Sequence, residues 1–484
     1  YKETMRKAFV IVDQDERRNM IQKGLLETAE KLGGHVWHNA DLLEEINYLV
    51  EYPTPLYGRI DDEFLKLPVP AVVTPMRDHQ RYYPVRKEDG SLMPYFLTVR
   101  NGGTKALENV QHGNEKVLRA RLDDAKFFFE NDRKKTLEGH RDDLTRINYQ
   151  EGLGDMRDKA DRLQKLTAFI GKDWHFTDEE MKDADRAAFL SKSDLATGMV
   201  TEFTELQGEM GKEYALLDGE KPEVAQAIFE QYMPRFSGDI LPKESIGRAL
   251  SLADKLDNLS ATFLRGLIPT GSQDPFALRR QTIGAVNILT DGKIHWDIRR
   301  GIAKALELLP GEQEVKDKVL SQVEDFFRQR IRAILLDNGI AYDIIDAVLA
   351  GPVDDIYAIF LKAQAMTESH LKEEADLRQA VTRLANITKG KTGGKVDPAL
   401  FEEDAEKNLE AALVKAMAAV EPLYREYRYA DALPYLKELT APINDYLDNV
   451  MVMVKDEAVK NNRISLLLKT LSFFDAWGDF SKLV

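Results

Sequence analysis

The imidazole and carboxylate side chains are the groups of this sequence that could hold a metal ion, because it contains no cysteine. Its eight histidines leave residues 176–294 without any imidazole. Many aspartates and glutamates lie in that stretch as possible oxygen ligands, Asp194, Asp254 and Asp257 among them. Such a set lacks the nitrogen ligands of a typical transition-metal site, so we expect no working metal centre there. The alternative interpretation places these aspartates on helix surfaces or at helix caps.

A second candidate site is the segment PTGSQDPFALRR, residues 269–280. Asp274 is a good helix N-cap and Pro275 a good first helical residue, which predicts that a helix begins there. Arg279 and Arg280 would project from its first turns, where they could face an RNA backbone. The alternative is an ordinary helix start with two solvated arginines. The glycine spacing matches neither a P-loop nor a dinucleotide-binding turn.

A third candidate is a basic set near the C-terminus. Its members are Lys455, Lys460, Arg463 and Lys469, with the amides of Asn461 and Asn462 beside them. The whole chain carries a formal net charge of −15, so any contact with nucleic acid must come from such local clusters. The alternative is a helical bundle with ordinary surface lysines.

Bulk properties describe a long, folded, multidomain chain. Its 484 residues correspond to about three to four domains, and 43% hydrophobic with 31% charged residues indicates a helix-rich globular protein. No apolar run reaches the roughly 18 residues of a membrane span, and no signal peptide is recognisable. The lack of cysteine fits a reducing cytoplasm. Because the chain begins at Tyr1 inside an amphipathic pattern, we expect an N-terminally truncated fragment.

The first 125 residues mix strand and helix patterns. The apolar run Lys7–Gln14 predicts a buried strand, and a helix should follow from Asp15 to the glycines at 33 and 34. Residues 70–76 and 93–103 predict further strands, with a hairpin-type turn at Asp89 and Gly90.

After residue 114 the patterns are helical. Residues 178–300 read as a compact helical block, 312–387 as more helices and 397–484 as a last helical block. KGKTGGK, Lys389–Lys395, is the best linker candidate because glycines make it flexible. The predicted fold class is mainly α and multidomain, with an N-terminal α/β piece.

Five blocks, taken in order, resemble the beta subunit of bacterial heterotetrameric glycyl-tRNA synthetase. They are TPMRDHQRYYPV (74–85) with Gly90, Leu92, Pro94, Phe96 and Asn101 after it; VQHGNEKVLRARLDDAKFFFEND (110–132); KSDLATGMVTEFTELQGEMGKEYALLDGE (192–220); EQYMPRFSGD (230–239); and ALSLADKLDNLSATFLRGLIPTGSQDPFALRR (249–280). Towards the C-terminus, Asn461, Asn462 and Arg463 resemble the DALR-type anticodon-binding domain of the arginyl and cysteinyl synthetases.

This resemblance implies a domain order. Residues 1–125 would form part of an α/β domain like the editing-like domain of the phenylalanyl enzyme's beta chain, and 126–190 a helical linker. Residues 191–300 would form a degenerate HD-like helical domain, in which Ser193, Asp194, Asp254 and Asp257 stand at the former metal positions. A helical body over 301–390 and the anticodon-binding domain over 396–484 would follow.

The resemblance also implies a function. The alpha subunit would use ATP and Mg and catalyse attachment of glycine to tRNA(Gly), whereas this chain would grip the tRNA and dock the alpha chain in an alpha2beta2 heterotetramer in the cytoplasm. We expect no catalytic residue, cofactor or metal in the chain itself. The expected tRNA-binding residues are Arg279, Arg280, Lys455, Lys460, Asn462, Arg463 and Lys469. The alternatives are an HD-type metal-dependent phosphohydrolase and a non-catalytic helical scaffold.

Overall fold

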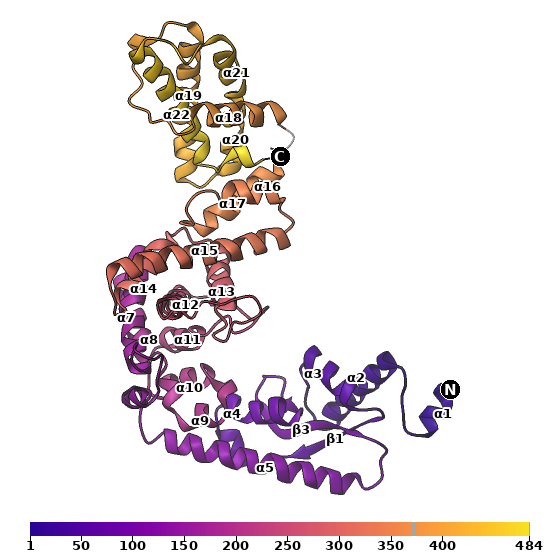
Figure 1. The fold of residues 1–484 in the computed structure, drawn as a ribbon. Helices are drawn as coiled ribbons and strands as arrows, with labels where there is room; N and C mark the ends of the chain where they lie inside the picture. Colours follow the sequence, from indigo (N-terminus) through magenta and orange to yellow (C-terminus); the bar gives the residue numbers. More distant parts are fainter. Residues whose placement is uncertain (370, 372–373, 484) are drawn as a thin grey trace. The chain divides into compact units, whose positions relative to one another are not determined.

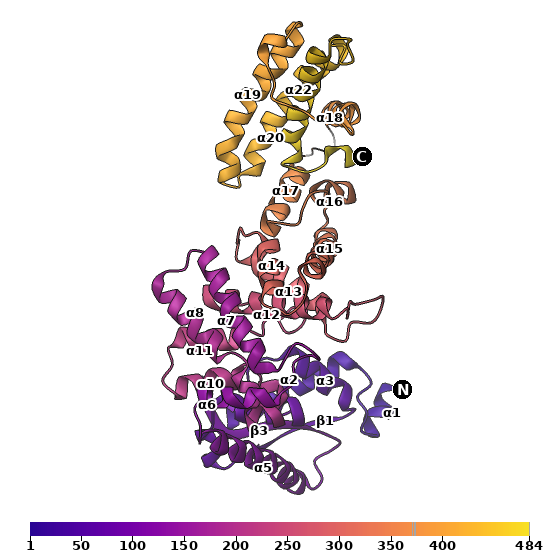
Figure 2. The same cartoon turned by 60° about the vertical axis from the view of Figure 1, so that its left-hand side comes forward.

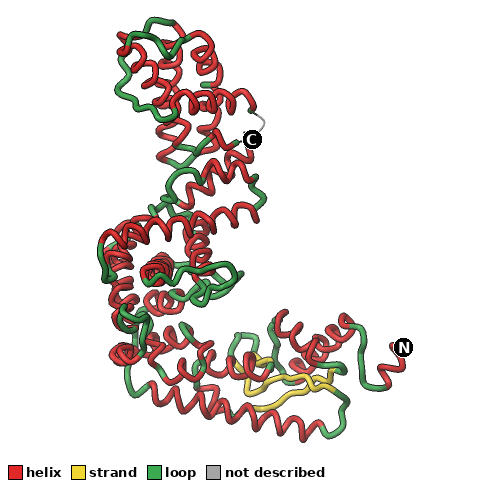
Figure 3. The backbone as a smooth tube through the Cα atoms, viewed as in Figure 1, coloured by secondary structure: helices red, strands yellow, loops and turns green. Residues whose placement is uncertain are grey.

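The computed structural model describes residues 1–369, 371 and 374–483, and it confirms a mainly helical chain with a small sheet near the N-terminus (Figure 1). The chain divides into two compact units. Unit 1 comprises Tyr1–Lys165, Thr177–Tyr232 and Glu244–Leu250, and unit 2 comprises Leu166–Phe176, Met233–Lys243 and Ser251–Val484. The strands of the described residues all lie in unit 1, where Figure 3 colours them yellow.

The sheet of unit 1 has three antiparallel strands in the order β1-β3-β2. They are β1 (Pro53–Arg59), β2 (Tyr83–Arg86) and β3 (Leu92–Asn101). In the register of β1 and β3, Pro53 lies opposite Asn101 and Gly58 opposite Phe96. The predicted turn joins β2 to β3, with Gly90 at φ 84°, a left-handed conformation that glycine adopts without strain. The last predicted strand and the position of the turn are therefore confirmed, whereas the strand before the turn, β2, was not predicted.

The predicted strand over Lys7–Gln14 is wrong. Helix α1 (Lys2–Lys7) ends where it should begin, and α2 (Gln14–Lys31) starts at its last residue. The carboxylate of Asp13 caps α2 by accepting bonds from the N–H groups of Asp15 and Glu16, each at 3.1 Å. Ile11 between the two helices is buried without strand pairing, whereas Phe9 and Val12 of the same run are exposed.

The predicted strand over residues 70–76 is also wrong, because α4 (Val69–Thr74) continues into one π-helical turn from Pro75 to His79. Pro68 and Pro70 stand at its start, where the missing N–H groups cost no helical hydrogen bond. A short apolar run fits a buried helix as well as a strand, and here tertiary burial favours the helix.

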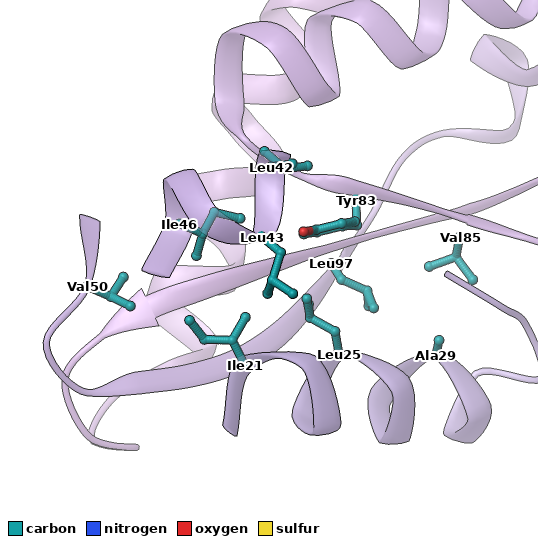
Figure 4. Close-up of a cluster of buried hydrophobic side chains, with 10 residues drawn as sticks. All are labelled: Ile21, Leu25, Ala29, Leu42, Leu43, Ile46, Val50, Tyr83, Val85 and Leu97. Atoms are coloured by element: carbon teal, nitrogen blue, oxygen red, sulfur yellow. The ribbon is translucent and has the colours of Figure 1, made fainter. Parts of the chain in front are cut away.

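The core above the sheet joins α2 and α3 (Ala40–Leu49) to the strands (Figure 4). Figure 4 shows side chains from both helices converging on Tyr83 and Leu97 of the sheet. The buried members are Ile21, Leu25, Ala29, Leu42, Leu43, Ile46, Val50, Tyr83, Val85 and Leu97.

The rest of unit 1 is helical. Its helices are α5 (Leu107–Asp132), α6 (Leu137–Arg141), α7 (Met156–Asp173), α8 (Asp178–Leu190), α9 (Gly198–Glu202), α10 (Glu209–Leu217), α11 (Pro222–Glu230) and the start of α12 (Ser245–Leu264). The buried carboxylate of Asp132, at the end of α5, accepts bonds from the N–H groups of Gly198 (2.7 Å) and Met199 (2.9 Å) and from the hydroxyl of Tyr214 (2.8 Å). It therefore connects α5 to α9 and α10.

Asp132→Asn should destabilise this junction by about 1–3 kcal/mol, because one buried donor loses its acceptor. Hydrogen exchange of the α9 amides in the intact chain measures the loss. Glu130→Gln is the matched control, since it makes the same chemical change at an exposed position of α5. Equal protection of α9 in both variants would contradict the assignment.

Unit 2 contains the end of α7, most of α12 and the remaining helices. These are α13 (Leu278–Asp291), α14 (Ile298–Glu307), α15 (Gln313–Asp337), α16 (Tyr342–Val348), α17 (Ile356–Glu368), α18 (Ala375–Thr388), α19 (Asp404–Arg425), α20 (Tyr429–Glu438), α21 (Thr440–Asn449) and α22 (Glu457–Asp475). Helix α19 packs against α20, α21 and α22, and α18 packs against α21 and α22 (Figure 2). Within the part of the chain that the structure describes, no helix is long and apolar enough to cross a membrane.

Candidate nucleic-acid interface

Helix α22 carries most of the basic set expected near the C-terminus. It begins after Asp456, whose carboxylate accepts bonds from the N–H groups of Ala458 (2.9 Å) and Val459 (3.1 Å). Lys455 precedes this cap and is exposed. Arg463, in contrast, is buried and only 3% exposed.

The guanidinium of Arg463 is held by an internal network. It donates to the carboxylate of Glu406 at 3.1 and 3.2 Å, to that of Glu402 at 2.9 Å and to the carbonyl of Met451 at 3.0 Å. These bonds occupy the planar donors that would read a base. The expected RNA contact of Arg463 stays a prediction, and it would require these bonds to open, because the buried carboxylate of Glu406 on α19 lies against the guanidinium.

Glu406 is fully buried and faces Arg463 across the bundle. Burial disfavours its charge, but the bonds from Arg463 and from the N–H groups of Glu403 and Glu402 hold the pKa of its carboxyl below the usual value. The bond to Glu406 raises the pKa of Arg463 in turn. Both groups stay charged, so the pair links α19 to α22 as an internal ion pair.

Asn462 is also committed inside the bundle. Its amide oxygen accepts from the N–H of Asp397 (2.7 Å), and its amide nitrogen donates to the carbonyl of the same residue (2.9 Å). One turn on, the hydroxyl of Ser465 accepts from the N–H of Gly394 (2.8 Å). Asn462 thus binds this chain's own backbone, and its expected RNA contact stays a prediction that would require these two bonds to break.

These bonds change the interpretation of KGKTGGK, which we expected to be a flexible joint. A Cβ added at Gly393 would lie 2.9 Å from Leu468, so the glycine permits close packing on α22. In addition, α18 precedes the segment and itself packs on α22. The glycines of this segment therefore allow two backbones to approach each other closely, in addition to the flexibility that they provide.

The other expected lysines on α22 are paired with carboxylates. Lys460 lies 2.5 Å from Glu457 in the first turns of the helix, and Lys469 lies 2.8 Å from Glu410 of α19. Their charges are largely offset locally. Of the basic residues expected in this region, Lys455 alone is exposed without an ion pair among the described residues.

Lysines that the sequence analysis did not select lie in the neighbouring loop. Lys389 and Lys395 are exposed, Lys391 is half-buried, and none has an ion pair within the described ranges. The ammonium of Lys391 lies 3.3 Å from the sulfur of Met453, which brings this loop to the one that carries Lys455. We call Lys389, Lys391, Lys395 and Lys455 the lysine loops. Three of these four lysines lie in KGKTGGK, which the sequence analysis interpreted only as a linker.

The segment around Arg279 departs from the expected helix start. Helix α13 begins at Leu278 rather than at Pro275, and the carboxylate of Asp274 accepts from the N–H groups of Leu278 (2.8 Å) and Arg279 (2.9 Å). This carboxylate occupies the anion position at the helix start. The guanidinium of Arg279 donates to the carbonyl of Gly271 (2.5 Å), and Arg280 is exposed.

A further arginine lies near Arg279. Helix α13 packs against α15, which carries Arg330 with its guanidinium 4.1 Å from the ring centroid of Phe326. Burial and then the nearby charge of Arg279 lower the pKa of Arg330. The carboxylate of Asp274 acts on Arg330 in the opposite direction, so an anion of the chain itself already lies near these arginines. Sequence reasoning could not find this pair, because 51 positions separate the two arginines.

Ser193 and Asp194 lie on a short 3₁₀ turn, Ser193–Ala196, in unit 1. Both are fully buried. The carboxylate of Asp194 accepts from the N–H of Gly208 (2.7 Å) and from the hydroxyl of Tyr232 (2.8 Å), and burial raises its pKa. The interpretation of Asp194 as a helix-surface residue is wrong, because its carboxylate serves as an internal acceptor.

Asp254 and Asp257 lie on α12 in unit 2 and are buried as well, with 7% and 1% of their surfaces exposed. They too are not on a helix surface. Across residues 1–369, 371 and 374–483 the structure has no group of three histidine, aspartate or glutamate side chains arranged to hold a metal ion.

Comparison with known proteins decides the family. A family model described as "Glycyl-tRNA synthetase beta subunit" matches residues 1–350, and one described as "DALR anticodon binding domain" matches residues 377–476. The glycine--tRNA ligase beta subunit of Clostridioides difficile is 44% identical over 100% of this chain and 70% of the relative. That of Desulforamulus reducens is 43% identical over 99% of this chain and 70% of the relative.

The chain belongs to the glycyl-tRNA synthetase beta subunit family. In this beta subunit the DALR match begins in α18 and ends just after α22. It therefore includes the internal ion pair of Arg463 and all four residues of the lysine loops.

Proposed function

We propose that this chain is the tRNA-binding beta subunit of a glycine–tRNA ligase and supports ATP-dependent ligation of glycine to tRNA(Gly), which the alpha subunit catalyses. The supporting observation is similarity to glycine--tRNA ligase beta subunits along the whole chain, 44% identity over 100% of its length. The reaction proceeds through a glycyl-adenylate, whose glycyl group passes to the tRNA.

The proposal includes partners and cofactors. The alpha subunit binds ATP, Mg and glycine, the two chains assemble as an alpha2beta2 heterotetramer in the cytoplasm, and this chain itself holds no cofactor or metal. This chain then contributes affinity for tRNA and holds the acceptor end of the tRNA in position. Such positioning of the reacting groups lowers the activation barrier of glycyl transfer.

RNA contact should come from surface cations that form no ion pair among the described residues. In the region matched by the anticodon-binding family these are the lysine loops, and on α13 the corresponding residue is Arg280. Arg279 and Arg330 are only half-exposed, and Arg279 already donates to the carbonyl of Gly271. Lys460 and Lys469 remain candidates only if RNA displaces Glu457 and Glu410. Phosphate contacts by such cations are sequence-independent and weaken with added salt.

The isolated chain should form no glycyl-adenylate and charge no tRNA, whereas the alpha subunit with this chain should charge tRNA(Gly). Glycine-dependent exchange of pyrophosphate into ATP measures the first step, and attachment of labelled glycine to tRNA measures the second. The alpha subunit alone is the control. Adenylate formation by the isolated chain, or charging by the alpha subunit that this chain does not increase, would refute the proposal.

A further inference from the structure

Trp37 is an unusual surface residue in unit 1. It is 63% exposed, whereas the other three tryptophans of the chain are buried or half-buried. The guanidinium of Arg86 lies 4.9 Å from the centroid of its ring, so a cation covers part of the indole and the remainder faces solvent. A single exposed aromatic side chain is ordinary on a protein surface, and Trp37 is distinguished by the arginine on its ring and by the hollow beside it.

The segment that carries Trp37 is fixed at both ends. His35 pairs with Arg86 through reciprocal backbone bonds of 2.8 and 3.0 Å, and the side chain of Asn39 caps α3 by accepting from the N–H of Leu42 (3.0 Å). The guanidinium of Arg86 also donates to the carbonyl of Gly90 at 2.9 Å. The indole is thereby held in place before any ligand arrives, which reduces the entropy cost of binding.

A hollow of about 180 Å³ opens beside Trp37. Its lining combines aromatic, cationic and small polar side chains: Trp37, His38, Asn39, Arg77, Tyr83 and Arg86, with Leu42, Val73 and Pro84. A second hollow of about 60 Å³ shares Trp37, His38, Asn39 and Tyr83. In Figure 4, Tyr83 lies between α3 and the sheet beside Leu42 and Leu43.

The charge around this hollow is opposite to that of the whole chain. No carboxylate is among its described lining residues, although the chain has a formal net charge of −15. The nearby carboxylates are Asp78, which pairs with Arg77 at 2.6 Å, and Glu88, which lies 4.0 Å from His35. Arg86 has no carboxylate partner in the described structure, so its charge remains available to an anion or to the π-face of a base.

We propose that the Trp37 hollow binds one unpaired base of an RNA strand, which stacks on the exposed part of the indole while Arg86, which has no carboxylate partner in the described structure, faces the adjoining phosphate. The source of the base rests on the proposed tRNA-binding function. Aromatic platforms with arginine beside them are the usual means of holding single-stranded RNA, because every base has a π-face. The volume of about 180 Å³ is below the roughly 300–1,000 Å³ of drug-sized ligand pockets, so one flat ring fits and a folded protein segment does not.

The test uses the full chain and a single-stranded hexa-adenylate RNA as the probe. Stacking on Trp37 should quench the tryptophan fluorescence, and an abasic strand of the same length and charge should not. Trp37→Phe should retain binding but lose the quenching. Trp37→Ala should weaken binding of the hexamer about tenfold, the scale of one base–aromatic stack.

Tyr48→Ala is the matched control, because Tyr48 is 64% exposed on the neighbouring helix α3 and lines neither hollow. It should leave hexamer affinity unchanged. Equal quenching by the abasic strand, or equal hexamer affinity of Trp37→Ala and the native chain, would overturn the inference. So would loss of alpha-subunit binding by Trp37→Ala with unchanged RNA binding. Affinity for intact tRNA(Gly) is measured in parallel, since its absence in the native chain would refute the proposed function instead.

Discussion

Arg463→Met should lower the local free energy of unfolding of the C-terminal bundle by about 3–5 kcal/mol, because it leaves the buried carboxylate of Glu406 without its cation. Native-state hydrogen exchange on the full chain, followed at the amides of α19 and α22, measures this opening free energy without assuming that the whole chain unfolds in one step.

Two controls separate the buried pair from the general effect of losing a cation. Lys469→Met removes a lysine of the same helix whose partner is Glu410, and its partly exposed pair should contribute at most about 1 kcal/mol. Glu406→Gln combined with Arg463→Met should recover part of the loss, because no unpaired charge remains. Equal costs for Arg463→Met and Lys469→Met would contradict the buried-pair assignment.

The same pair gives the bundle a pH dependence. The folded pKa of Glu406 lies below its unfolded value, which is about 4.3 for an unperturbed glutamate. Its contribution to stability is therefore fully present above that value and is lost as the pH falls through the folded pKa. The Glu406→Gln variant should lack this part of the acid sensitivity of α19 and α22.

Changing the four lysines of the lysine loops to alanine should weaken binding of tRNA(Gly) by about tenfold or more at low salt, because several phosphate contacts disappear together. The slope of log affinity against log salt concentration should become shallower by about one unit for each contact that is lost. Equilibrium binding of labelled tRNA, titrated at several salt concentrations, gives both quantities.

Lys460→Ala with Lys469→Ala is the matched control, because both lysines already pair with carboxylates of the bundle. Its affinity and salt slope should stay close to those of the native chain. A larger effect in this control than in the lysine-loop variant would show that RNA binds on the paired face of α22 instead. Unchanged affinity in both would remove the C-terminal bundle from tRNA binding.

The sequence by itself determined the family and much of the local structure. The ordered blocks from residue 74 to residue 280 identified the family, because they combine many specific positions that no single motif supplies. The start of α2 and its end near Gly33 could also be predicted from the sequence, because helix capping depends on residues that are close in sequence. The turn at Asp89 and Gly90 was readable for the same local reason.

The local sequence did not determine the secondary structure of two short apolar runs. The runs at 7–14 and 70–76 have strand-like composition, but the first lies between two helices and the second is itself helical. Burial of residues 71–76 on all sides leaves no periodic polar positions to distinguish a helix from a strand, whereas the run at 7–14 is mostly exposed.

The tertiary structure alone decided which basic residues face solvent. Arg463 and Asn462 have the right chemistry for RNA, but Glu406 and Asp397, more than 50 positions earlier, occupy their hydrogen-bonding groups. The unpaired lysines lie instead in two loops, one with Lys455, which the sequence analysis had selected, and one with Lys389, Lys391 and Lys395, which it had interpreted only as a linker. Charge is a property of a residue type, whereas its availability depends on partners that folding brings from distant parts of the chain, and a single sequence does not specify those partners.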